Sequence, residues 1–184
     1  MSANIQSDST GKIQYVLTQS DNSTCALACC AMAYCEYNQF CVNDPEAAMK
    51  RVSQQFPGAW TKKNGTTLSN AALILTSFGV KNSGVVEHSG KDKLVQALAS
   101  NVKFGRPAIL AVGWGGGGGH AVLCVEVRGT GENALFVIRD PWFGLQEVPA
   151  KQMPAYTPGC SLTVNCSKND KSTGTFSRVM IFTT

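Results

Sequence analysis

The sequence predicts an α+β fold in which N-terminal helices pack on a C-terminal antiparallel β-sheet. Helix-forming segments occupy the first half of the chain, short β-branched segments occupy the second half, and no internal repeat is visible. The chain has 184 residues, of which 43% are hydrophobic and 15% are charged. This length and composition predict one folded domain, residues 1–184, with a helical half at about 20–100 and a sheet half at about 105–184.

Four segments have the features of helices. Residues 25–37 are rich in alanine and follow Thr24, a candidate N-cap. A second helix is expected after Asp44, because Pro45 suits a first helical turn. The other two helices are expected within residues 66–80, ending at a glycine, and within residues 91–100. The N-terminal residues 1–18 are expected to form an irregular lead-in.

The sheet is expected to begin after Gly105, where the segments become short, β-branched and bounded by glycine or proline. The predicted strands lie within residues 106–114, 120–128, 134–142 and 175–183. Residues 129–133 are expected to form a hairpin turn between the second and third strands. His120 and Asp140 stand at the far ends of these two strands, so the hairpin would bring their side chains together.

Several classes of function are not indicated. The net charge of +4 is mild and no run of like charges occurs, so we expect no nucleic-acid partner. No apolar run approaches the ~20 residues of a membrane span, and the N-terminus lacks a secretory signal. We therefore expect a protein made in the cytoplasm that stays there, leaves by a signal-independent route or is delivered into another cell, unless it is cut from a longer chain.

The glycine run before His120 is not followed by Gly-Lys-Ser/Thr, and no Cys-x-x-Cys pair occurs, so we expect neither a nucleotide cofactor nor a structural metal. The cysteine content is nevertheless high for a cytosolic protein and favours an oxidising destination. Pairing of Cys35 with Cys41 and of Cys160 with Cys166 would close short loops, although sequence alone does not assign the pairs. The chain has eight cysteines: Cys25, Cys29, Cys30, Cys35, Cys41, Cys124, Cys160 and Cys166.

Four residues are candidates for a catalytic site. Cys25 stands in the first turn of a predicted helix, where the helix dipole and a nearby imidazolium favour a thiolate nucleophile. The chain has only two histidines, and His120 is the candidate base because His88 lies in a polar connection and is expected to be exposed. Asp140 would orient the imidazole of His120, and the side-chain amide of Gln19 would join the backbone N–H of Cys25 in an oxyanion hole.

These residues resemble the motifs of the papain-like cysteine peptidase superfamily, most of all its compact bacterial branch, which includes the bacteriocin-processing, double-glycine-leader peptidases. The similar blocks are QSDNSTCALACCAMAY, GTTLSNAALILTSFGV, RPAILAVGWGGGGGHAVLCVEV and ALFVIRDPWFG, which together span most of residues 15–150. The resemblance implies a papain-like two-part fold, with Cys25 as nucleophile, His120 as base, Asp140 as orienter and Gln19 as oxyanion donor. The branch usually has Asp-Cys-Gly where this chain has Thr24-Cys25-Ala26, a difference that bears on the substrate more than on the chemistry.

The expected function is therefore hydrolysis of peptide bonds through an acyl-enzyme on Cys25, in a bacterial effector or toxin domain. Its expected partners are a protein or peptide substrate and an inhibitor or immunity protein. Two alternatives remain at this stage. The same triad serves deamidases, amidases and acyltransferases, and a disulfide-stapled binding module would use the frame without catalysis.

Overall fold

The computed structural model describes residues 2–41, 43–56, 58–158 and 173–184. All four predicted helices are present, and among the described residues none is long and apolar enough to cross a membrane. The second helix begins as expected, with Asp44 accepting a hydrogen bond from the Ala47 amide and Pro45 in the first turn. The helices are α1 (Cys25–Asn38), α2 (Pro45–Ser53), α3 (Leu68–Ser77) and α4 (Lys91–Asn101).

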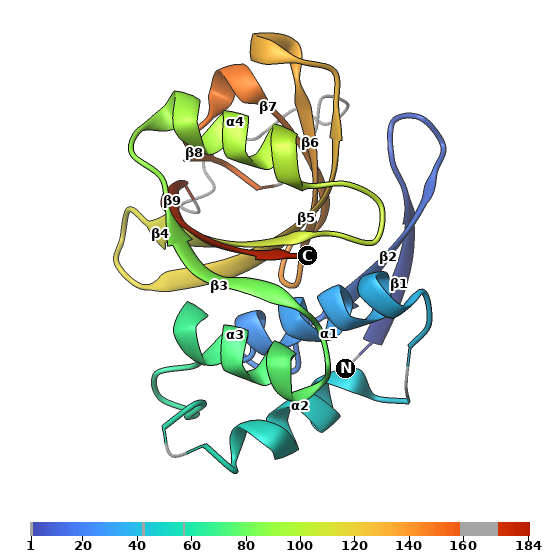
Figure 1. Cartoon of the computed structure of the whole chain (residues 1–184), viewed down its shortest axis with the longest axis vertical. Coiled ribbons are helices and arrows are strands. Elements are labelled where there is room, and N and C mark those ends of the chain that lie inside the picture. Colours follow the sequence, from blue (N-terminus) through green and yellow to red (C-terminus); the bar gives the residue numbers. More distant parts are fainter. Residues whose placement is uncertain (1, 42, 57, 159–172) are drawn as a thin grey trace.

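A seven-stranded antiparallel sheet forms the centre of the molecule, as the sequence predicts (Figure 1). Its path runs β3-β9-β4-β5-β6-β7, and β8 adds to β9. Three of these strands, β3, β7 and β8, are not among the predicted ones because they are short and interrupted by glycine, proline or charge. The strands are β3 (Asn82–Glu87), β4 (Ala108–Trp114), β5 (Gly119–Arg128), β6 (Leu135–Asp140), β7 (Gly144–Pro149), β8 (Ala155–Tyr156) and β9 (Gly174–Thr183).

The sheet is covered on both faces. Figure 1 shows α1, α2 and α3 together on one side of the sheet and α4 on the other. Leu27 and Ile74, from α1 and α3, belong to one hydrophobic core, whereas Leu94 and Leu98 of α4 belong to a second core. Burial on both faces explains why the central strands read as nearly continuous apolar runs. The predicted helical half, at about residues 20–100, therefore includes one strand of the sheet, β3, and one helix, α4, that covers the opposite face of the sheet.

The expectation of an irregular N-terminus is wrong. Residues 2–18 form a hairpin of β1 (Ser2–Ser7) and β2 (Ile13–Thr18), whose turn is closed by hydrogen bonds from the Thr10 and Lys12 amides to the Asp8 carboxylate. Val16 and Leu17 of β2 are both buried in a hydrophobic core, so the hairpin packs against the rest of the molecule. Asp followed three residues later by Gly, between two segments of strand-like residues, is the turn signal that would have revealed it.

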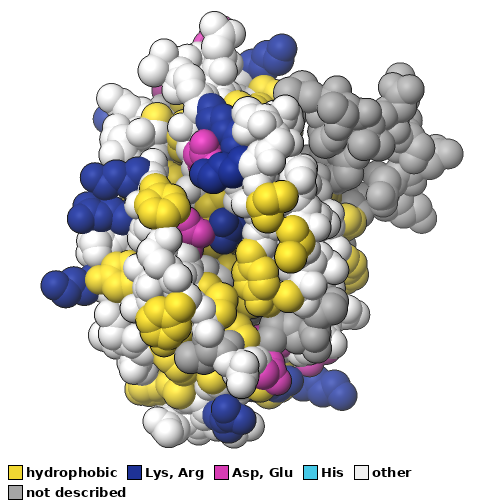
Figure 2. All heavy atoms as spheres, turned by 90° about the vertical axis from the view of Figure 1, so that its right-hand side faces the viewer, with side chains coloured by type: hydrophobic (Ala, Val, Ile, Leu, Met, Phe, Trp, Pro, Cys, Tyr) yellow, Lys and Arg dark blue, Asp and Glu magenta, His cyan; other side chains and the backbone are white. Residues whose placement is uncertain are grey.

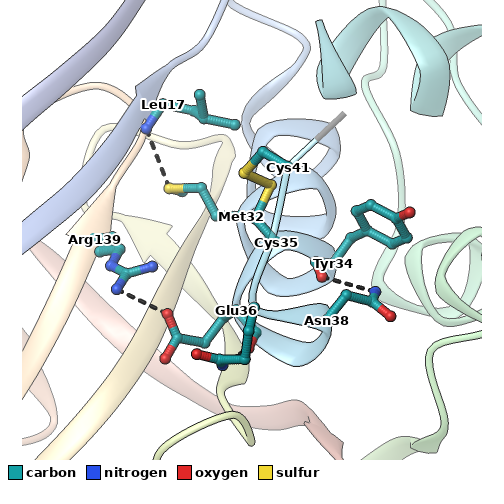
Figure 3. Close-up of a disulfide and its surroundings, with 9 residues drawn as sticks. Leu17, Met32, Tyr34, Cys35, Glu36, Asn38, Cys41 and Arg139 are labelled. Carbon is teal, nitrogen blue, oxygen red and sulfur yellow. Dashed lines mark hydrogen bonds and ion pairs between the residues drawn. A yellow bond between two sulfur atoms is a disulfide. The ribbon is translucent and has the colours of Figure 1, made fainter. Parts of the chain in front are cut away.

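A disulfide joins Cys35, near the end of α1, to Cys41 in the connection that follows (Figure 3). This is one of the two pairings that the sequence suggests, and the other lies outside the described residues. The same end of α1 is held against the sheet by an ion pair of 2.9 Å between Glu36 and Arg139 of β6. The disulfide thus fixes the end of α1 that lies farthest from Cys25.

Replacing Cys41 with serine is expected to lower the free energy of unfolding by about 2 kcal/mol, because the short closed loop no longer restricts the unfolded chain. Urea unfolding followed by circular dichroism measures this change. The wild-type chain in reducing agent should show the same loss, while the variant should respond less to the reductant. An unchanged unfolding midpoint in the variant would contradict the expectation.

Candidate active site

Three elements bring the candidate catalytic side chains together. Cys25 is the first residue of α1, His120 is the second residue of β5, and Asp140 is the last residue of β6. Strands β5 and β6 are antiparallel neighbours, and Leu123 of β5 lies opposite Arg139 of β6. This register places the start of β5 beside the end of β6, so the hairpin argument from the sequence describes the observed arrangement.

A buried contact joins His120 to Asp140. The imidazole Nε2 lies 2.8 Å from the Asp140 Oδ1, and both side chains are almost wholly buried. Asp140 Oδ1 also accepts hydrogen bonds from the amides of Trp142 and Phe143, at 2.7 and 3.1 Å, while the Tyr156 hydroxyl donates to Oδ2 at 2.5 Å. Because each carboxylate oxygen is held, Asp140 is a fixed acceptor that determines the orientation of the imidazole.

Cys25 interacts with the other side of the imidazole. Asp140 occupies Nε2, which leaves Nδ1 as the ring nitrogen that faces the thiol. Burial alone disfavours the imidazolium, but the hydrogen bonds with Asp140 and Cys25, together with their negative charge, raise the pKa of His120 to about 9. His120 is therefore protonated at neutral pH, which is the charge state that stabilises a thiolate beside it.

The loop before α1 differs from the sequence-based expectation in two details. The Thr24 hydroxyl does not cap the helix but bonds to the backbone of Asp21, so the first amides of α1 receive no side-chain cap from Thr24. The Gln19 side-chain amide donates to the Asp21 carbonyl at 2.7 Å, and its Oε1 is buried with no described partner. The Gln19 backbone donates to the Pro141 carbonyl at 3.0 Å, which ties this loop to the residue after Asp140.

Aromatic side chains enclose the imidazole. The ring of Trp114 stacks on His120, with 5.5 Å between centroids and 25° between planes, and Trp142 meets it edge-on at 6.3 Å. Trp114 and Tyr156 are functional candidates that the sequence reading missed. Tyr156 lies on β8, far along the chain from β5, so only the pairing of β8 with β9 brings it to Asp140. The exclusion of water by these rings strengthens the His120–Asp140 contact.

A cleft of about 500 Å³ opens over Cys25 and His120. One wall comes from the loop before α1 and from residues 62–68, and the other comes from the facing ends of β4 and β5. The glycines before His120 form this end of the sheet, and Gly117 and Gly118 take the left-handed backbone conformation at φ 90°. Their small size leaves the backbone of the β4–β5 turn open to the cleft.

A second hollow, of about 570 Å³, lies at the other end of α1 and contains neither Cys25 nor His120. It runs between β2, the end of α1 and residues 102–104, beside the exposed side chains of Ile13 and Phe104. Figure 2 faces the side of the molecule that lies on the right in Figure 1, and shows hydrophobic side chains interspersed with basic and acidic ones. This hollow has no candidate nucleophile–base pair, so the cleft over Cys25 is the candidate active site.

Comparison with solved structures identifies the fold. The chain aligns with the peptidase domain of Streptococcus ComA, a bi-functional ABC transporter involved in a quorum-sensing pathway, with a TM-score of 0.58 and 15% identity over 91% of this chain and 96% of that one. The chain has a papain-like fold. The Pseudomonas avirulence protein AvrPphB also matches, over 74% of this chain and 81% of that one, but its TM-score of 0.38 and identity of 16% support no inference. No protein-family model and no curated protein matches the chain.

The other free cysteines that the structure describes do not line the cleft over Cys25. Cys29, Cys30 and Cys124 are free thiols with no solvent exposure. Burial raises the pKa of all three, that of Cys124 to about 12, so they remain protonated core side chains. Among the cysteines that the structure describes, only Cys25 combines partial exposure with a histidine partner.

His88 is not the exposed surface residue that the sequence predicts. Its side chain is half-buried, with its ring edge-on to Phe182 at 6.1 Å, because β3 pairs with β9 at the edge of the sheet. It does not line the cleft over Cys25. Among the described residues there is also no group of three or more His, Cys, Asp or Glu side chains arranged to hold a metal ion.

Proposed function

We propose that the protein is a cysteine peptidase in which Cys25 attacks the carbonyl carbon of a peptide bond. The observation that carries this proposal is the buried His120–Asp140 pair beside the partly exposed Cys25, with a raised His120 pKa, at the base of a cleft. The papain-like fold supports the proposal, because the solved structure that the chain resembles is a peptidase domain. A thiolate next to an imidazolium is the activated nucleophile of such chemistry.

In the proposed first step, the sulfur of Cys25 bonds to the carbonyl carbon, and the protonated His120 gives its proton to the nitrogen of the departing amine as the carbon–nitrogen bond breaks. The product is a thioester on Cys25 and a neutral imidazole. In the second step His120 takes a proton from water, the resulting hydroxide attacks the thioester, and the thiolate–imidazolium pair is restored. Asp140 holds the ring orientation through both steps.

We infer that the negative oxygen of the tetrahedral intermediate is stabilised at the N-terminus of α1. The amide of Cys25 is in the first helical turn and has no partner within the helix, so it is available to this oxygen. Gln19 is the proposed second donor, since a side-chain amide carries two N–H groups and only one is needed for the bond to the Asp21 carbonyl. The bond to Asp21 would then orient the second N–H rather than compete with it.

The proposal is tested by incubating the protein with a complex mixture of unfolded proteins and identifying the products by mass spectrometry. We expect new peptide termini with the wild-type chain and none with Cys25→Ala, while Cys124→Ala, a core thiol variant, should keep its activity if it folds. A gain of about one mass unit without chain cleavage would assign the site to deamidation instead. Equal products from wild type and Cys25→Ala would refute a Cys25-dependent enzyme.

A further inference from the structure

The turn formed by residues 61–65 lines the same cleft as Cys25 and carries two lysines. The backbones of Thr61 and Gly65 exchange hydrogen bonds of 3.0 and 2.8 Å, and the Asn64 amide donates to the Thr61 hydroxyl at 3.0 Å. This short closed turn presents Lys62 and Lys63, both exposed, along the wall of the cleft that contains Cys25 and His120.

This turn is attached directly to the loop that precedes Cys25. Trp60, just before the turn, donates its indole N–H to the Ser23 carbonyl at 3.1 Å. Gly65 approaches the same carbonyl so closely that a Cβ would lie 3.0 Å from it, and its backbone is left-handed at φ 65°. The position of the two lysines is therefore tied to a residue two places before the nucleophile.

The charge of the two lysines is not neutralised by described residues. Neither lysine forms an ion pair within the described part of the chain, and none of the described residues that line the cleft is Asp or Glu. Asp21, in the loop before α1, is paired with Lys50 at 3.4 Å. Together with the buried Asp140 carboxylate, a thiolate–imidazolium pair has a net charge of −1, so the positive charge of the cleft is confined to its wall, at Lys62 and Lys63.

We propose that this turn makes the cleft select acidic peptides, with Asp or Glu close to the scissile bond. The inference rests on the proposed peptidase function and names the substrate class of the same site. Carboxylate side chains of the bound peptide would lie against Lys62 and Lys63 and neutralise the positive charge of this wall. Because the ammonium groups stay hydrated, each contact gives a modest gain, and the two together favour an acidic peptide about five- to tenfold over a neutral one.

The preference is measured in two stages. New termini from a tryptic peptide mixture are first aligned at the cleavage point, where Asp and Glu should be enriched within about four residues of the scissile bond, the reach of an extended chain across a cleft of this size. The best substrate is then synthesised with Glu and with Gln at the enriched position. We expect kcat/KM to be about five- to tenfold higher for the Glu peptide, and this ratio should fall with added salt.

Variants of the turn provide the decisive comparison. Lys62→Ala with Lys63→Ala should reduce the ratio to about one, and Lys62→Glu with Lys63→Glu should make a Lys-substituted peptide the better substrate. The matched control is Lys91→Glu with Lys93→Glu on α4, which makes the same change in net charge on the opposite side of the sheet and should keep the ratio of the wild type. Cleavage without acid enrichment, or a ratio that survives the Lys62 and Lys63 substitutions, would overturn the inference and leave the peptidase proposal intact.

A binding measurement separates this inference from the failure of the proposed function. Fluorescein-labelled peptides that differ only in Glu-Glu against Gln-Gln are titrated into the Cys25→Ala chain and followed by fluorescence anisotropy. Tighter binding of the Glu-Glu peptide, lost in the combined Lys62 and Lys63 variant, supports the acidic selectivity even where the wild type hydrolyses no peptide. Equal binding of the two peptides contradicts it.

Discussion

Replacing His120 with alanine is expected to lower kcat/KM for peptide hydrolysis by about 10²–10⁴-fold, because the variant has no group to protonate the leaving amine or to activate water. The same substitution should remove the rapid alkylation of Cys25 by iodoacetamide below pH 7, since no imidazolium remains to hold a thiolate. Between pH 6 and 8 the protonated fraction of His120 should change little in the wild type, because the pKa of this residue is about 9. Peptide mass mapping after timed labelling measures the rate at Cys25.

The chain contains its own control for this experiment. His88 is the other of the two histidines; it is half-buried against Phe182 and does not line the cleft. His88→Ala should therefore retain both the hydrolysis and the alkylation rates. Slow alkylation of Cys25 in the wild type, or equal rates in wild type and His120→Ala, would show that no thiolate–imidazolium pair exists.

Substitutions of Asp140 should separate its charge from its hydrogen bonds. Asp140→Ala is expected to destabilise the fold by about 3–5 kcal/mol, because it leaves the His120 ring, two backbone amides and the Tyr156 hydroxyl without their buried acceptor. Asp140→Asn keeps an acceptor oxygen for the ring but removes the negative charge, so the fold should persist while the pKa of His120 falls from about 9. Thermal unfolding and a pH titration of the His120 ring by NMR measure the two effects.

The pH dependence of stability provides a check on the same pair. The folded-state pKa of His120, about 9, lies above the ordinary value of 6.5, so the contribution of its proton to stability is complete below pH 6.5 and is lost as the pH rises through 9. A thiolate at Cys25 would offset this change in bound protons, so the measurement is made on the Cys25→Ala chain, whose stability should decline over this window more steeply than that of the same chain with Asp140→Asn. Tyr156→Phe in the Cys25→Ala chain keeps the charge pair and should retain most of the slope, and identical slopes with and without Asp140→Asn would contradict the assignment.

The sequence predicts the local and adjacent parts of this structure best. Helices α1 to α4 follow from spacing and end signals within each segment, and the meeting of His120 with Asp140 follows from one hairpin of adjacent strands. The N-terminal hairpin has a local turn signal at Asp8–Gly11, but its two strands pack on the sheet through contacts with distant residues, which the sequence does not indicate. For the same reason β3 and β7, which pair at the two edges of the sheet, have weak local signals.

The parts of the candidate site that were not predicted depend on long-range pairing or on rotamers. Tyr156 reaches Asp140 only because β8 is held on β9, a strand whose own position depends on β3 and β4. The ring of Trp114 stacks on His120 across the β4–β5 pair, whereas its sequence position indicates only an aromatic before a glycine run. The hydrogen bond of Gln19 to Asp21 is a rotamer choice within a loop, which no pattern of residues specifies.

The proposed nucleophile and its base belong to different layers of the molecule. Cys25 is carried by a helix and His120 by the sheet beneath it, and α1 packs on β5 through side chains such as Leu27 and Leu123. Neither layer alone holds both halves of the reacting pair. The protein would consequently be inactive while its chain is unfolded or partly folded. Hydrolysis would begin only when α1 packs on the sheet, so the catalytic rate would measure how completely the interface between α1 and β5 has formed.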